Sequence, residues 1–199
     1  MASLSGFFST ITAMLKNKHF IYFAFLLVLL FGADQAQAQS FARVTIGQKT
    51  REAQIIGMQR DGRELAGILV YANNAWNNIY FNIDDLQTIK QAAQNYFGDF
   101  DSMKLKKGNK KSIKKYGTIS CFVEWGSDKK SIDRFCDTKA DLGYVFVKAA
   151  PYFCVSVHSA KNQNAAQSSP AYQTFEKLNL LFTKSQITDF CQKTTPKSE

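Results

Sequence analysis

The first half of the chain carries four runs rich in β-branched and aromatic residues, separated by short polar breaks. These runs predict strands at Ala42–Gln48, Glu52–Gln59, Glu64–Ala72 and Asn78–Ile83. The break after the second run contains Asp61-Gly62, and Asn73-Asn74 follows the third; both pairs tolerate the positive φ of a tight hairpin turn. Because such short connections join antiparallel neighbours, we expect an antiparallel sheet.

A stripe of apolar residues with helical spacing follows the fourth run. Its members recur every three or four positions: Leu86, Ile89, Ala93, Tyr96, Phe97 and Phe100. This pattern predicts an amphipathic helix, and we expect the helix to end at Gly98.

The second half repeats this order of strands and a helix. Further runs predict strands at Thr118–Trp125, Ser131–Asp137, Gly143–Lys148, Tyr152–Ser159 and Lys177–Phe182, and a helix from about Lys184 to Thr194. The two strand-to-helix junctions align at an offset of 101 residues, with Asn82 and Thr183 as the expected N-caps. An internal duplication explains this alignment; the alternative is that such junctions resemble one another without a duplication.

Together these elements predict an α+β fold of antiparallel sheets with two helices. If the duplication is real, the halves form a tandem ββββα pseudo-repeat. The expected organisation is a signal peptide at 1–38, a first ββββα half at 39–101, a basic linker at 102–117 and a second β-rich half with a C-terminal helix at 118–199.

An export signal is predicted near the N-terminus. Phe20–Phe31 is a run of 12 apolar or aromatic residues; Lys16 and Lys18 precede it, and Ala36-Gln37-Ala38 follows. A basic region, an apolar core of about 7–15 residues and an A-x-A site are typical of a secretory signal peptide, which predicts a periplasmic or extracellular protein. The alternative, a retained anchor helix, needs roughly 20 apolar residues. Met14 would begin a signal of more ordinary length.

The 199 residues carry a formal net charge of +9, which falls to +8 without residues 1–38, because 23 basic and 15 acidic residues remain. Seven of the basic residues lie within twelve positions: Lys104, Lys106, Lys107, Lys110, Lys111, Lys114 and Lys115. Such a cluster attracts an anionic polymer or lipid surface. Since no arginine or aromatic residue is interleaved, no specific nucleic acid is expected as a partner. The alternative is a solvated linker.

The four cysteines, Cys121, Cys136, Cys154 and Cys191, all lie in the second half. An even number of cysteines in an exported chain predicts disulfides. A hairpin across Gly126–Lys130 would place Cys121 opposite Cys136, which leaves Cys154 and Cys191 to link the last helix to the sheet. A zinc site is the alternative, but the spacing holds no C-x₂₋₄-C pair, and we expect no metal or other cofactor.

The sequence contains no familiar catalytic motif, so no catalytic residue is assigned. His158 is the only histidine beyond residue 38. On a strand, Cys154 would lie about 13 Å from it, too far for a hydrogen bond, and Ser156 would lie about 6.6 Å away without an identifiable acid to complete a triad. A small hydrolase would need two convergent carboxylates, such as Glu124 or Asp133 with another acid.

We therefore expect an exported, non-catalytic binding or interaction protein of the cell envelope or extracellular space. Its partner would be a protein or another envelope component, and its oligomeric state is not defined by the sequence. The first alternative is a binder of polyanions or membrane surfaces that acts through Lys104–Lys115. The second alternative is the carboxylate hydrolase.

Overall fold

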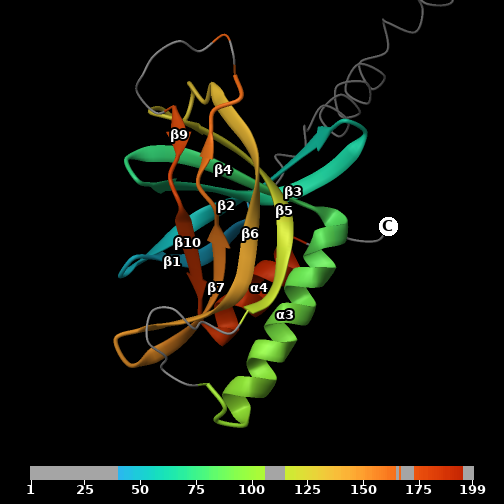
Figure 1. Ribbon diagram of the computed structural model, residues 1–199, viewed down its shortest axis with the longest axis vertical. Helices are drawn as coiled ribbons and strands as arrows, with labels where there is room; N and C mark the ends of the chain where they lie inside the picture. Colours follow the sequence, from blue (N-terminus) through green and yellow to red (C-terminus); the bar gives the residue numbers. More distant parts are fainter. Residues whose placement is uncertain (1–39, 106–114, 165, 167–172, 195–199) are drawn as a thin grey trace, which may run out of the picture. The chain divides into compact units, whose positions relative to one another are not determined.

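The computed structural model describes residues 40–105, 115–164, 166 and 173–194 (Figure 1). Ser40–Glu199 form one compact unit. The signal peptide predicted at 1–38 lies outside the described residues. So do five lysines of the basic segment: Lys106, Lys107, Lys110, Lys111 and Lys114.

Eight strands form a closed antiparallel barrel within this described part of the chain. They are β1 (Phe41–Ile46), β2 (Lys49–Arg60), β3 (Arg63–Ala72), β4 (Ala75–Asn82), β5 (Lys115–Gly126), β6 (Arg134–Val147), β7 (Ala150–Val157) and β10 (Leu178–Phe182). Each strand pairs with its neighbour along the chain, and β1 closes the barrel on β10, where Thr45 lies opposite Leu181. Between β7 and β10 the chain forms a two-stranded ribbon from β8 (Ala160–Lys161) and β9 (Thr174–Phe175).

The expected α+β fold with separate sheets is wrong. Strands hold 57% of the described residues, and two helices accompany them, α3 (Ile83–Asp101) and α4 (Lys184–Lys193). Each half of the chain supplies four barrel strands and one helix, but β4 pairs with β5 and β1 pairs with β10, so both halves share a single sheet. Closure of the barrel pairs backbone N–H and C=O groups that would be unpaired at the edges of two open sheets. An origin by duplication stays a prediction.

Side chains fill the inside of the barrel. The largest fully buried strand residues include Phe81, Trp125, Phe153, Ile68, Ile79 and Leu142. Tyr96 of α3 and Phe190 of α4 belong to the same cluster, so the helices and the barrel share one core. An eight-stranded barrel is just wide enough for side chains to fill, and this interior is a packed core.

The helix starts follow the predicted caps. Asn82 caps α3 and accepts a hydrogen bond from the amide of Asp84, while Thr183 caps α4 in a full capping box with Gln186. The predicted end at Gly98 is wrong, because α3 continues to Asp101. Helical backbone tolerates a glycine at a cost of about 1 kcal/mol relative to alanine, and the helix ends one turn later at the cap formed by Ser102.

Two predicted hairpin turns are confirmed. Asp61 and Gly62 have φ of 52° and 73°, and Asn73 and Asn74 have φ of 52° and 58°. Two runs expected as separate strands, Ser131–Asp137 and Gly143–Lys148, instead fall largely in the 14-residue strand β6. Lys139 and Asp141, between them, stay in the ladder because they alternate with the buried Ala140 and Leu142 and so face outward from the barrel.

Candidate functional site

The β2–β3 hairpin lies across the outer face of the barrel. Its tip residue Arg60 contacts Asp137 of β6, although β3, β4 and β5 separate the two strands in the barrel order. Both strands of the hairpin carry a glycine at the point where the hairpin bends over the barrel. Gly57 of β2 pairs with Ala66, and Gly67 of β3 pairs with Ile56. A Cβ atom at Gly67 would overlap the carbonyl oxygen of Ile79 on β4, so only glycine allows this close approach.

The hairpin covers a small apolar cluster on the outer face, separate from the barrel core. Its buried members are Leu65, Tyr80 and Phe122. The rings of Tyr80 and Phe122 stack with centroids 6.0 Å apart and an interplanar angle of 23°. Phe135 of β6 lies 6.0 Å from Phe122, so three strands supply one aromatic floor.

Arg60 lies on this aromatic floor. Its guanidinium carbon is 3.8 Å from the ring centroid of Phe122. The guanidinium donates to both carboxylate oxygens of Asp137, at 2.6 and 3.2 Å, and its Nε lies 3.6 Å from Asp61. The hydrogen bond to Asp137 raises the pKa of Arg60, against a smaller opposing effect of burial. The cation is therefore held over the ring, where its positive charge meets the negative face of the π-system.

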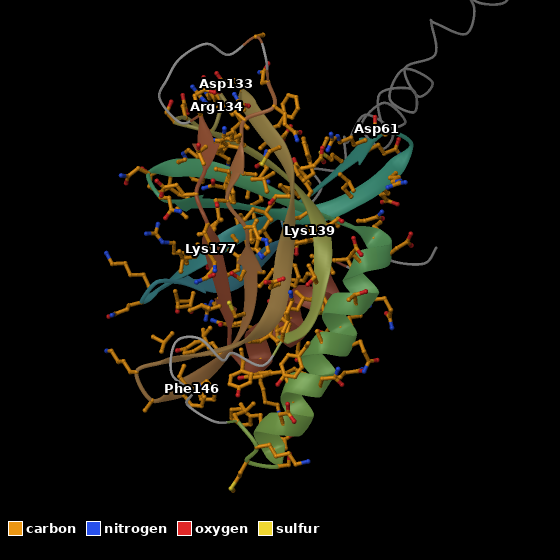
Figure 2. The ribbon with its side chains drawn as sticks, in the orientation of Figure 1. Asp61, Asp133, Arg134, Lys139, Phe146 and Lys177 are labelled. Carbon is orange, nitrogen blue, oxygen red and sulfur yellow. The ribbon has the colours of Figure 1, made fainter. Side chains whose placement is uncertain are left out.

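A cleft of about 680 Å³ opens between the hairpin tip, β4 to β6 and the start of α3. Tyr80, Leu65 and Phe122 form its floor. Its charged residues are three cations and three acids: Arg60, Arg63, Lys139, Asp61, Asp85 and Asp137. Asp61 lies at the hairpin tip and Lys139 on β6 (Figure 2). The formal charges of the cleft sum to zero, so its rim is zwitterionic.

Besides Arg60, three groups that line the cleft have raised pKa values: Tyr80, Asp85 and Cys121. Burial raises the pKa of Asp85, and the neighbouring Asp84 adds to the shift. Burial raises the pKa of Cys121 to about 12, with Cys136, Asp85 and Asp137 as further causes. At neutral pH the Cys121 thiol is therefore protonated and is a poor nucleophile.

The register of β5 and β6 differs from the one predicted for the cysteines. Cys136 lies opposite Val123, and Cys121 lies opposite Thr138, so the expected direct opposition of Cys121 and Cys136 is wrong. The turn is longer than predicted, because pairing starts only at Trp125 and Arg134. A diagonal pair of this kind is separated by roughly 7–8 Å, beyond most disulfides.

The four cysteines are not disulfide-bonded in this structure. Cys154, on β7, lines a hollow with Lys177 and Asn179, whereas Cys191, on α4, lines another hollow beside Phe97 of α3. The structure thus places Cys154 and Cys191 in different surroundings. Disulfides stay a prediction.

His158 contacts a carboxylate but no nucleophile. Its Nε2 lies 3.1 Å from Asp141, which also pairs with Lys115 at 2.7 Å. Burial works to raise the pKa of Asp141, but hydrogen bonds from Lys115, His158 and Thr118 outweigh it and lower the value to about 2. Ser156 hydrogen-bonds instead to Asn179 Oδ1 at 2.7 Å, so these residues do not form a Ser–His–Asp chain.

The remaining sequence-predicted residues do not line the cleft, although Glu124 hydrogen-bonds to Tyr80 of its floor. Glu124 accepts a hydrogen bond from Asn78 on the outside of β5, and Asp133 pairs with Arg134 at 2.6 Å. Two lysines of the basic segment are described: Lys104 follows α3, and Lys115 is the first residue of β5. Of these two lysines, Lys115 forms an ion pair with Asp141.

Sequence reasoning missed the residues that build the cleft. Arg60 and Arg63 flank the predicted Asp61-Gly62 turn, which was a usable signal, because arginines at a hairpin tip can reach neighbouring strands. Phe122 and Lys139 gave no such signal. They look like ordinary outward-facing strand residues until the hairpin is folded over them.

Comparison with known proteins identifies a family. Residues 31–198 match the family described as "Uncharacterised Treponema protein", and the chain belongs to that family. No curated protein and no solved structure matches the chain. Neither helix in the described part of the chain has the length and apolar character that crossing a bilayer would require.

Proposed function

We propose that this member of the Treponema family is an exported, non-catalytic module that binds a polypeptide segment of an envelope or extracellular partner. The binding site is the outer cleft beneath the β2–β3 hairpin. The observation that carries the proposal is the combination of a sealed barrel with a 680 Å³ cleft over an ordered aromatic floor.

The barrel itself favours recognition on its outer face. In the described part of the chain, large apolar side chains occupy its interior as a packed core. Its eight strands close into a ring, so the strand edge left for an extended peptide is mainly the part of β2 beyond Gln54, which pairs with β3 alone. Outward-facing side chains are therefore the main means of recognition on this barrel.

The chemistry of the cleft suits a peptide with one acidic and one apolar side chain. Tyr80 and Phe122 keep 6% and 8% of their surfaces exposed, and these parts give the cleft a small apolar floor. Among the described residues, Arg63 and Lys139 form no ion pair, whereas Arg60 is committed to Asp137. An acidic side chain of the partner would meet Arg63 and Lys139 while its apolar neighbour covers the floor.

Site-specific photo-crosslinking tests this proposal. A photoreactive residue at Ser120, which lines the cleft, should form an adduct with a partner polypeptide in envelope extract. The same residue at exposed Lys49, on the β1–β2 hairpin, is the matched control and should not. Arg63→Glu with Lys139→Glu should abolish the Ser120 adduct. An adduct that forms equally at both positions, or that survives the charge reversal, contradicts the proposal.

A carboxylate hydrolase is the second candidate, favoured by one observation. Asp85 and Asp137 line the same cleft; burial raises the pKa of Asp85, while Asp137 pairs with Arg60. Two acids in unlike environments are typical of an acid and base pair. Turnover of glycoside or ester substrates that is lost in both Asp85→Asn and Asp137→Asn, with the fold intact, would favour this candidate over the binding module.

A further inference from the structure

Exposed apolar side chains gather at one end of the barrel, away from the cleft. The C-terminal end of α3 and the β6–β7 hairpin both lie there (Figure 1). Tyr96 joins the two elements, since its hydroxyl donates to the carbonyl of Pro151 at 3.1 Å and its ring lies 6.0 Å from Phe100. Tyr144 continues the contact toward Phe146, at 6.0 Å. These two elements are therefore packed against each other at this end, through the buried rings of Tyr96 and Tyr144.

Met103 is the most exposed large apolar residue of this end, with 91% of its surface in contact with solvent. It follows α3 with a φ of 53°, in the left-handed region. Its amide donates to the carbonyl of Phe100, and the amide of Lys104 donates to that of Asp99, which is a Schellman cap. Glycine is the usual residue at this position, because a side chain is strained there. An exposed methionine at this position is unfavourable both for the backbone and for hydration.

The β6–β7 hairpin supplies the other apolar side chains. Val147 pairs with Ala150, so Lys148 and Ala149 form a two-residue tip. Phe146 and Val147 are only half-buried (Figure 2 labels Phe146 at this tip). We call these two residues, together with Phe100 and Met103, the apolar end.

Two exposed lysines adjoin the apolar end: Lys104 follows Met103, and Lys148 follows Val147. Of the nearby acids, Asp101 pairs with Lys184 at 2.8 Å, whereas Asp99 accepts a hydrogen bond from Tyr116 at 2.8 Å, which is not an ion pair. The charge here is complementary to an anionic surface.

We propose that the apolar end docks on the surface of an anionic lipid bilayer. Phe100, Met103, Phe146 and Val147 would enter the headgroup region, while Lys104 and Lys148 would contact lipid phosphates. A few apolar side chains or basic residues alone bind membranes weakly, and the two together give stable attachment. None of these residues lines the cleft, so the bilayer surface is a partner additional to the polypeptide of the proposed function.

Vesicle co-sedimentation of the chain from Gln39 onward tests the docking, since all described strands and helices lie within the compact unit Ser40–Glu199. We expect binding to phosphatidylcholine vesicles that contain phosphatidylglycerol and little binding to phosphatidylcholine alone. Met103→Gly is the decisive variant, because it relieves the left-handed backbone and so keeps the fold while it removes the apolar side chain. It should weaken binding by about tenfold, and Phe146→Ser should do the same.

Matched controls distinguish the loss of a side chain at the apolar end from the loss of an equally exposed side chain elsewhere. Phe41, on β1, is 42% exposed against 40% for Phe100, so Phe41→Ser should leave binding unchanged where Phe100→Ser weakens it. Lys104→Gln and Lys148→Gln should each weaken binding about fivefold, from roughly 1 kcal/mol per lysine; Lys49→Gln and Lys161→Gln should not. Equal binding to both vesicle types, or binding unaffected by Met103→Gly and Phe146→Ser, overturns the proposal.

Discussion

Arg60 and Asp137, 77 residues apart in the chain, are joined by two hydrogen bonds that hold the β2–β3 hairpin over the outer face of the barrel. The same guanidinium covers the ring of Phe122 at 3.8 Å. One side chain thus links the hairpin, the aromatic floor and β6, and it forms one wall of the cleft. The stability of the hairpin and the shape of the proposed binding site depend on the same contact.

Loss of the Arg60 side chain should loosen the hairpin. We expect Arg60→Ala to lower the free energy of unfolding by about 1–2 kcal/mol, because an exposed ion pair, a cation–π contact and packing over Phe122 are all lost. Hydrogen exchange should accelerate at the hairpin tip more than elsewhere. Arg63→Ala, in the same hairpin but without an ion pair among the described residues, should change stability by less than about 0.5 kcal/mol. Equal effects of the two variants would contradict this account.

The bend of the hairpin should depend on the glycine of β3. Gly67→Ala places a methyl group against the backbone of Ile79 and should cost at least about 2 kcal/mol in urea unfolding. Gly98→Ala is the control, because nothing lies within 4 Å of a Cβ atom at this helical position. That substitution should stabilise the protein by about 0.5–1 kcal/mol. A tolerated Gly67→Ala would show that the two strands do not approach as described.

Asp141 should contribute stability that is lost in acid. Its pKa is lowered to about 2, against about 3.9 in an unfolded chain, so the folded state favours the ionised form. The contribution is complete above about pH 4 and disappears as the pH falls toward about 2. The stability difference between the wild type and Asp141→Asn should therefore shrink over this interval; since the site is partly exposed, we expect at most about 1 kcal/mol. A difference that is constant with pH would contradict the assignment, and Glu64→Gln serves as an exposed control.

The reduced thiols should react slowly near neutral pH. Burial raises the pKa to about 12 for Cys121 and Cys154 and to about 11 for Cys136 and Cys191. Because the thiolate is the reactive form, alkylation by iodoacetamide should be far slower than in the urea-unfolded chain. Cys191, the least buried of the four, should be modified first. Rapid modification of Cys121 in the folded protein would show that the cleft floor is open. Mass mapping without reductant tests the predicted disulfides separately.

Local features were the ones that could be predicted from the sequence. The Asp61-Gly62 and Asn73-Asn74 turns and the caps at Asn82 and Thr183 depend on residues only a few positions apart. The cap of α3 at its C-terminal end could not be predicted, because Met103 occupies the position where glycine is expected.

Features that depend on pairing between residues far apart in the chain could not be predicted from the sequence. Barrel closure requires Thr45 to meet Leu181, and neither residue signals this partner. The position of Cys136 opposite Val123 follows from the length of the β5–β6 turn, where Gly126 packs against the backbone of Ser131. The cleft arises only when the bend at Gly67 brings Arg60 to Phe122, so single residues along the chain did not indicate it.

Charge reversal across the cleft is the decisive test of polypeptide binding at this site. Once photo-crosslinking at Ser120 has identified the partner segment, its affinity for the intact chain can be measured by titration calorimetry. We predict that Arg63→Glu with Lys139→Glu weakens binding at least about tenfold, and that a matching acid-to-lysine change in the partner segment restores most of the loss. An affinity that is unchanged by the reversal, or a loss that the partner change does not restore, would contradict recognition in the cleft.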